Sequence, residues 1–139
     1  MAEPVPWFER VFTFDAPQGI FPNVIERLRG TPSRLEERLR PLPRLVLTRK
    51  TAGTWSIQEN AGHLFDLEPL WAGRVDDFIA GSELLRAADL TNRKTHQAGH
   101  NDSSVEKILS GFRTARMELV RRLDGLDPAS FTRTALHPG

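Results

Sequence analysis

Histidine is the residue type best suited to chemistry in this sequence, and His63 stands in the most informative setting. The chain has four histidines and no cysteine, so a thiolate metal site and a cysteine nucleophile are both excluded. His63 lies in the stretch G-T-W-S-I-Q-E-N-A-G-H-L-F-D-L-E-P-L-W, residues 53–71. A zinc or nickel ion at His63 would need about three protein ligands. Glu59, one helical turn earlier, is spaced to act as an acceptor for the imidazole ring.

A simpler interpretation of His63 needs no metal. On a helical wheel, His63 lies about 40° from Glu59 and about 40° from Leu67, so it flanks the apolar face of its helix. It would then be a bundle histidine that hydrogen-bonds to Glu59 or Glu68. The residues alone leave both interpretations open.

His96 and His100 form an H-x-x-x-H pair in T-H-Q-A-G-H-N-D, residues 95–102. On a helix, this spacing puts two imidazoles on one face, which suits metal binding. Gly99 lies between them and Asn101 follows, and both are weak helix formers. A pair of solvated loop histidines is the simpler interpretation. If His63 has metal-binding partners in this chain, these two are the candidates.

Glu68 falls on the apolar stripe of the same helix, between Leu64 and Trp71. A buried carboxylate must be paired or hydrogen-bonded. It either lines a cavity near His63 or forms an ion pair with an arginine of a neighbouring helix, such as Arg116.

Three amphipathic helical patterns position these residues, and strand-like alternation is nearly missing. Residues 20–41 predict a helix that Gly30, Thr31 and Pro32 divide in two. The second helix begins at Ser56, which forms a capping-box pattern with Glu59, and ends at Gly81 with a bend at Pro69. Residues 82–102 predict a long loop. The third helix runs from Ser103 to about Gly125.

Length and charge restrict the class of protein. A chain of 139 residues predicts a single domain over 1–139. Its 19 basic and 18 acidic residues give a net charge of +1, which argues against nucleic acid or a membrane surface as a partner. No apolar run approaches the roughly 18 residues of a spanning helix, and the N-terminus does not read as a signal peptide. We expect a cytoplasmic protein.

The motif G-x-W-S-I-x-E-x-x-x-H-L-x-D-x-E, from Gly53 to Glu68, resembles the DinB-like superfamily of damage-inducible helical proteins. Further stretches are similar to one branch of it: E-R-L-R-G-T-P-S-R-L-E-E at 26–37, N-R-K-T-H at 92–96, F-R-T-A-R at 112–116 and the closing H-P. The resemblance implies an all-α, up-down-down-up helical bundle. It also implies that His63 is one of three metal ligands, the other two coming from an H-x-x-x-H motif on the fourth helix. This sequence shows no such motif there, so we expect the fourth helix to be missing and the domain to be incomplete at its C-terminus.

Two functions follow as hypotheses. The first is a DinB-like bundle with an incomplete histidine site, paired as a homodimer because the uncovered apolar stripes need a cover. The second, implied by the resemblance, is a metal-dependent enzyme, a thiol-cofactor transferase or a small-molecule hydrolase or isomerase, that uses zinc or nickel with His63 as one of three histidine ligands.

Overall fold

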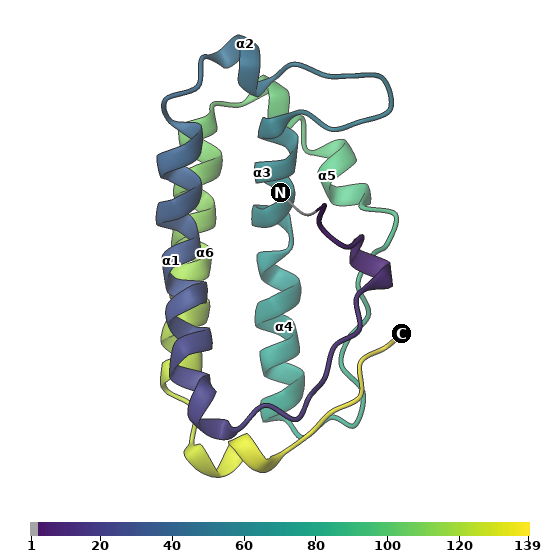
Figure 1. The fold of residues 1–139 in the computed structure, drawn as a ribbon, viewed down its shortest axis with the longest axis vertical. Helices are drawn as coiled ribbons and strands as arrows, with labels where there is room; N and C mark the ends of the chain where they lie inside the picture. The colour runs from purple at the N-terminus through teal and green to yellow at the C-terminus, as the bar shows by residue number, and fades with distance from the viewer. Residues whose placement is uncertain (1–2) are drawn as a thin grey trace.

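The computed structural model describes residues 3–139, apart from the side chain of Trp7, as a helical bundle (Figure 1). The long helices are α1 (Phe21–Leu39), α3 (Ile57–Asp66), α4 (Glu68–Ile79) and α6 (Val105–Asp124); the short ones are α2 (Arg44–Leu47) and α5 (Arg93–Gln97). Single 3-10 turns occur at Trp7–Glu9, Gln18–Ile20, His100–Asp102 (η3) and Pro128–Thr132 (η4). The predicted all-α class is confirmed. None of the helices between residues 3 and 139 is long and apolar enough to cross a membrane.

The rods run up, down and down, as Figure 1 shows. Helix α1 rises, α3 and α4 descend end to end as one column, and α6 descends beside both. Helix α6 packs against α1 and against the α3–α4 column, so it is the central rod. After α6 the described chain continues as η4 and an irregular tail, and no fourth rod follows within residues 3–139.

The apolar core lies mainly at one end of the bundle. Helix α2 closes this end, and the core residues there are Leu39, Leu47, Ala61, Ile108 and Leu109. Phe112 and Val120 of α6 are fully buried farther along. Ile25 of α1 and Leu119 of α6 are buried there as well.

Helix α1 is continuous, so the predicted division at Gly30–Pro32 is wrong. Pro32 has no N–H to donate to the carbonyl of Leu28, four residues earlier. The guanidinium of Arg116, on α6, donates to that oxygen at 3.5 Å. Thr31 donates its hydroxyl to the carbonyl of Arg27 at 2.8 Å. A residue of another helix thus supplies a long hydrogen bond where the proline removes one. The local sequence of α1 does not contain this contact, which is why it predicted a division.

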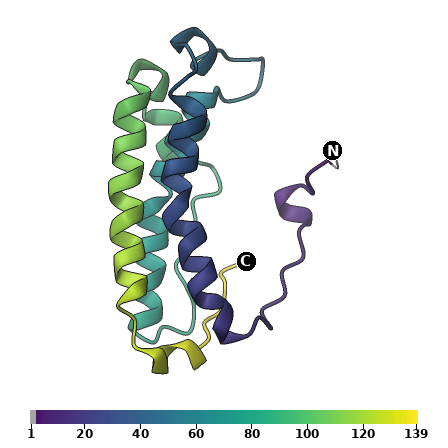
Figure 2. The same ribbon diagram turned by 60° about the vertical axis from the view of Figure 1, so that its left-hand side comes forward.

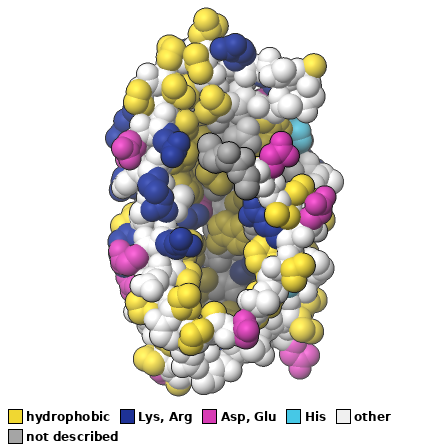
Figure 3. Space-filling model, viewed as in Figure 1, with side chains coloured by type: hydrophobic (Ala, Val, Ile, Leu, Met, Phe, Trp, Pro, Cys, Tyr) yellow, Lys and Arg dark blue, Asp and Glu magenta, His cyan; other side chains and the backbone are white. Residues whose placement is uncertain are grey.

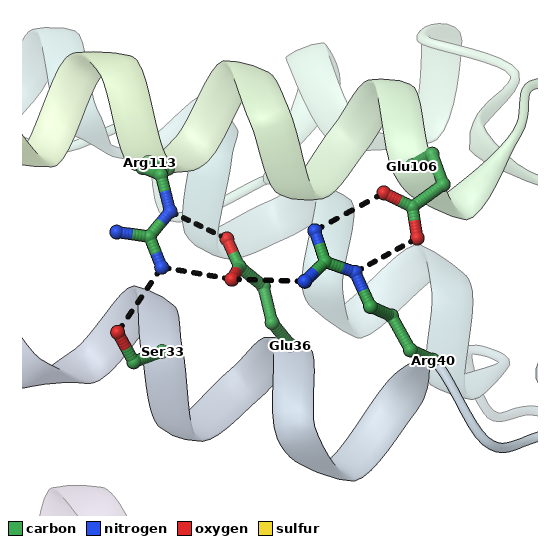
Figure 4. A network of polar contacts seen from close by, with 5 residues as sticks. All are labelled: Ser33, Glu36, Arg40, Glu106 and Arg113. Carbon is green, nitrogen blue, oxygen red and sulfur yellow. Dashed lines mark hydrogen bonds and ion pairs between the residues drawn. The ribbon is translucent and has the colours of Figure 1, made fainter.

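Ion pairs join α1 to α6 (Figure 4). Glu36 accepts from Arg113 at 2.7 and 2.8 Å and from Arg40 at 3.3 Å. Arg40 also donates to Glu106, and Arg113 donates to the hydroxyl of Ser33. The hydrogen bonds from Arg113 lower the pKa of Glu36 below its ordinary value. The network links the two helices through the buried Glu36, the exposed Arg40 and the half-buried Arg113.

The start of α3 is as predicted. The hydroxyl of Ser56 accepts from the N–H of Glu59 at 3.0 Å, and the Glu59 carboxylate accepts from the N–H of Ser56 at 2.8 Å. The predicted bend also occurs: α3 and α4 are separate helices joined at Leu67, just before Pro69.

The prediction of an unbroken loop over 82–102 is wrong, because this crossing segment contains α5 and η3. The Asp89 carboxylate accepts from the N–H groups of Thr91 and Arg93, the second of which is the first residue of α5. Gly99 adopts a left-handed φ of 64°, which separates α5 from η3. Helix α6 is capped by Ser104, one residue later than predicted.

Candidate functional site

A chain of hydrogen bonds links His63 of α3 to the crossing segment. His63 Nδ1 lies 2.9 Å from the hydroxyl oxygen of Thr95, on α5. That hydroxyl donates to Asp66 Oδ2 at 2.9 Å, and His100 Nε2 lies 2.8 Å from the same Asp66 oxygen. The side chains of Asp66 and His100 are each only 8% exposed. We call these four residues the Asp66 cluster.

A glycine makes room for this cluster. Gly62 is buried on α3, and a Cβ built on it would overlap the imidazole of His100. The side-chain amide of Gln58, one turn earlier, donates to the carbonyl oxygens of His100 and Ser103 at 2.6 and 2.8 Å. The crossing segment is therefore seated directly on the backbone of α3. Position 62 is therefore occupied by glycine, a weak helix former, where any larger side chain would collide with the His100 ring.

Aromatic contacts cover the other side of His63. The ring of Trp55, just before α3, lies 4.8 Å from that of His63 and 5.4 Å from that of His96, centre to centre. A hollow of about 140 Å³ adjoins His63, Asp66 and Thr95 and reaches Asp89 and Lys94. His63 is thus partly enclosed and partly open to a small hollow.

The surroundings favour the neutral form of His63. Burial lowers the pKa of the His63 imidazole below its ordinary value, and the nearby His100 lowers it further. The negative charge of Asp66 opposes this shift but does not cancel it. At neutral pH, His63 therefore has one ring nitrogen with a free lone pair.

Neither Glu59 nor Glu68 is a hydrogen-bond partner of His63, because both carboxylates are engaged elsewhere. The Glu59 carboxylate is used by the N–H of Ser56 and by Lys50, at 2.8 and 2.9 Å. Glu68 is 2% exposed and is paired with Arg116, the alternative that its apolar position suggested. The imidazole of His63 instead contacts Thr95. Thr95 is 32 residues from His63 in the sequence, so no helical spacing pattern could indicate this contact. The predicted partners of His63, Glu59 and Glu68, are therefore replaced by a residue that only the tertiary structure brings close.

His96 and His100 do not face a common point. His96 is exposed on α5 and touches Trp55, whereas His100 is buried against α3. The expectation that both are solvated loop residues is therefore wrong for His100. Their H-x-x-x-H spacing is not helical, because Gly99 ends the turn between them.

The donor set around His63 does not fit a zinc or nickel ion as a three-ligand centre. Among residues 3–139, no group of three or more histidine, aspartate or glutamate side chains is placed to hold a metal. Asp66 and His100 influence His63 electrostatically, but they are hydrogen-bonded to each other. His63 could supply one ligand, and the described residues do not complete a three-ligand centre.

An apolar groove runs between α1 and the α3–α4 column, with α6 as its floor. Figure 3 shows it as a hollow on this face, with hydrophobic side chains inside and basic ones along the α1 rim. One part, of about 450 Å³, is lined by Leu28, Leu64, Leu67, Trp71, Val75, Arg116, Leu119 and Leu123. A second part, of about 440 Å³, continues past Val24, Val75 and Phe78 to Phe131. The stripe expected to face a fourth rod is thus open.

An up-down-down bundle with a histidine on its second rod defines the class of protein to which this chain is similar. The family model of the DinB superfamily matches residues 27–139, and the chain belongs to that superfamily. A search of curated protein sequences found no match.

Among solved structures, the chain is similar to YfiT from Bacillus subtilis, described as a probable metal-dependent hydrolase with an unusual four-helix bundle topology. The TM-score is 0.78 at 16% sequence identity, over 94% of this chain and 75% of that chain. At this identity, the likeness establishes the fold.

Proposed function

We propose that this chain is a DinB-superfamily bundle subunit with an incomplete histidine site, in which His63 offers one ligand nitrogen and the other described residues offer none that converge with it. The arrangement of the Asp66 cluster supports this proposal most strongly. Asp66 and His100 satisfy each other at 2.8 Å, and Thr95 lies between Asp66 and His63. The cluster therefore orients one imidazole, and its Asp66 Oδ2 and His100 Nε2 atoms are engaged with each other.

Metal content tests the proposal. The 139-residue chain is purified without a histidine tag, and zinc and nickel are measured by mass spectrometry in the wild type and in His63→Ala. The proposal predicts no stoichiometric metal in either protein. One equivalent of zinc or nickel in the wild type, lost in His63→Ala, would contradict it.

The second candidate function is a metal-dependent transferase or hydrolase in which His63 is one of three histidine ligands. Two observations favour it: the similar bundle is described as a probable metal-dependent hydrolase, and burial keeps His63 neutral. A metal ion, when bound, would polarise a water or a thiol. The same metal measurement separates the two candidates. The metal-dependent enzyme requires one equivalent of zinc or nickel per chain, and the incomplete site predicts none.

We further propose that the apolar groove is covered by a second copy of this chain. Soluble monomers rarely expose contiguous apolar patches of more than a few hundred Å², and a bundle face is readily self-complementary. The N-terminal segment adds apolar surface: Phe8, Val11 and Phe14 are 87%, 92% and 94% exposed. In Figure 2 this segment stands away from the bundle on the groove side. A second copy would bury both surfaces.

The dimer is tested by light scattering after size exclusion of the 139-residue chain at micromolar concentration. The expected mass is twice the 15.7 kDa of one chain. A monodisperse, compact monomer would contradict this part of the proposal and leave the histidine site unaffected.

A further inference from the structure

The hydrogens around Thr95 can be assigned one by one. A threonine hydroxyl has one hydrogen to donate and accepts with its oxygen. The Thr95 hydroxyl donates to Asp66 Oδ2 at 2.9 Å. Its only hydrogen is therefore used, and toward His63 it acts as an acceptor. An imidazole nitrogen 2.9 Å from an acceptor oxygen must carry a hydrogen.

The second contact of Asp66 supports the assignment of the Thr95 hydroxyl as a donor to Asp66. Asp66 Oδ2 also lies 2.8 Å from His100 Nε2. An oxygen that faces a hydroxyl and an imidazole nitrogen together is a carboxylate oxygen that accepts from both. Gln58 fixes the backbone of His100, and Gly62 lets its ring lie against α3, so this donor is held in place. Asp66 thus draws the Thr95 hydrogen away from His63.

We infer that His63 is held as the Nδ1–H tautomer by Thr95 and Asp66, which leaves Nε2 as the ring nitrogen with the free lone pair. This inference rests on the proposed function, in which His63 is the one ligand the chain offers, and it adds the positioning residues. Thr95 is the direct positioning residue, and Asp66 and His100 act through it. Imidazole ligands in metal proteins are oriented in this way by a hydrogen bond at the other ring nitrogen.

Nitrogen NMR of the metal-free protein tests the assignment. The chain is labelled with ¹⁵N-histidine, treated with a chelator and studied at about pH 8, above the ordinary histidine pKa. His63→Gln identifies the His63 signals by their loss. We expect Nδ1 in the protonated, pyrrole-type range and Nε2 in the unprotonated, pyridine-type range. The reverse pattern in the wild type overturns the inference.

Two threonine variants separate positioning from a general effect on folding. Thr95→Val removes the acceptor at nearly constant shape, so the His63 signals should move toward the Nε2–H form that imidazole prefers in water. Thr95→Ser retains a hydroxyl and should restore the wild-type pattern. Thr132→Val, which removes an exposed hydroxyl bonded to Ala129, is the matched control and should change nothing at His63. An unchanged tautomer in a folded Thr95→Val protein would contradict the inference.

The outcome is independent of the metal measurement. If the wild type binds one equivalent of zinc, the proposed incompleteness of the site fails, but the chelated protein still reports its tautomer. If the tautomer is Nε2–H and no metal binds, the proposed function stands and the inference fails.

Discussion

Glu68 of α4 and Arg116 of α6 form a two-pronged ion pair inside the bundle, with oxygen–nitrogen distances of 2.6 and 3.0 Å. The two side chains are 2% and 9% exposed. Arg116 also donates to the carbonyl of Leu28, so this one side chain joins all three rods. The pair supplies a polar centre on the floor of an otherwise apolar groove.

Breaking this pair on one side should be strongly destabilising. Glu68→Gln leaves the Arg116 charge buried without its partner, and we expect a loss of about 3–5 kcal/mol in the free energy of unfolding. The double variant Glu68→Leu, Arg116→Met removes both charges and should recover most of that loss. Denaturant titration measures both. Glu118→Gln, which breaks an exposed pair with Arg121, is the control and should have a small effect. A similarly small effect of Glu68→Gln would refute the buried pair.

Gly62→Ala should destabilise the protein although alanine is the better helix former. The added methyl would overlap the ring of His100, and moving that ring disturbs its bond to Asp66. We expect a loss of about 1–3 kcal/mol from overpacking. Gly30→Ala in α1 is the matched control, because its methyl meets only the flexible end of Arg34. It should gain up to about 1 kcal/mol from helix propensity. Equal stabilisation by both variants would contradict the seating of His100 on α3.

The free energy of unfolding should fall on mild acidification because of His63. Burial lowers the pKa of this imidazole in the folded state, so the unfolded chain binds the proton more readily. The stabilising contribution is present above the ordinary histidine pKa of about 6.5 and is lost as the pH falls through that value toward the folded pKa. His63→Gln should show a shallower decline between about pH 7.5 and 5, measured by denaturant titration. Parallel curves for the two proteins would contradict the shift.

Charge placed in the groove should separate the proposed dimer. Val75 lies in both parts of the groove, so Val75→Asp would put a carboxylate into the buried interface. We expect a monomer by light scattering, with the helical circular dichroism retained. Ile79→Asp changes an apolar residue of the same helix that is 50% exposed and outside the groove lining, and it should remain dimeric. If both variants keep the wild-type mass, the groove is not the contact between copies.

Local patterns predicted the helices well but not the contacts between them. Ser56 and Glu59 form their capping box, and α3 and α4 separate before Pro69, because both features depend on a few neighbouring residues. The continuity of α1 depends in part on Arg116, 84 residues after Pro32, so no local pattern contains it. The short helix α5 begins where the Asp89 carboxylate accepts from the N–H of Arg93, a contact that the polar composition of this segment did not indicate.

The candidate site was predicted in part for the same reason. His63 was identified from its helix and from the family resemblance, and the pairing of Glu68 with Arg116 was among the alternatives. Thr95 lies in the N-R-K-T-H stretch and Asp66 in the His63 motif, yet their mutual contact appears only when the crossing segment folds onto α3. Gly62 lies inside α3 where the ring of His100 packs against the helix, and a glycine in a helix interior is a local feature that can accompany such packing.

Equilibrium zinc titration of the tag-free 139-residue chain tests the central claim most directly. The wild type and His63→Ala are titrated in parallel by calorimetry at neutral pH. The incomplete site predicts that neither protein shows saturable one-to-one binding at micromolar zinc. Tight binding of one zinc ion by the wild type that disappears in His63→Ala would contradict the claim and establish a metal centre at this histidine.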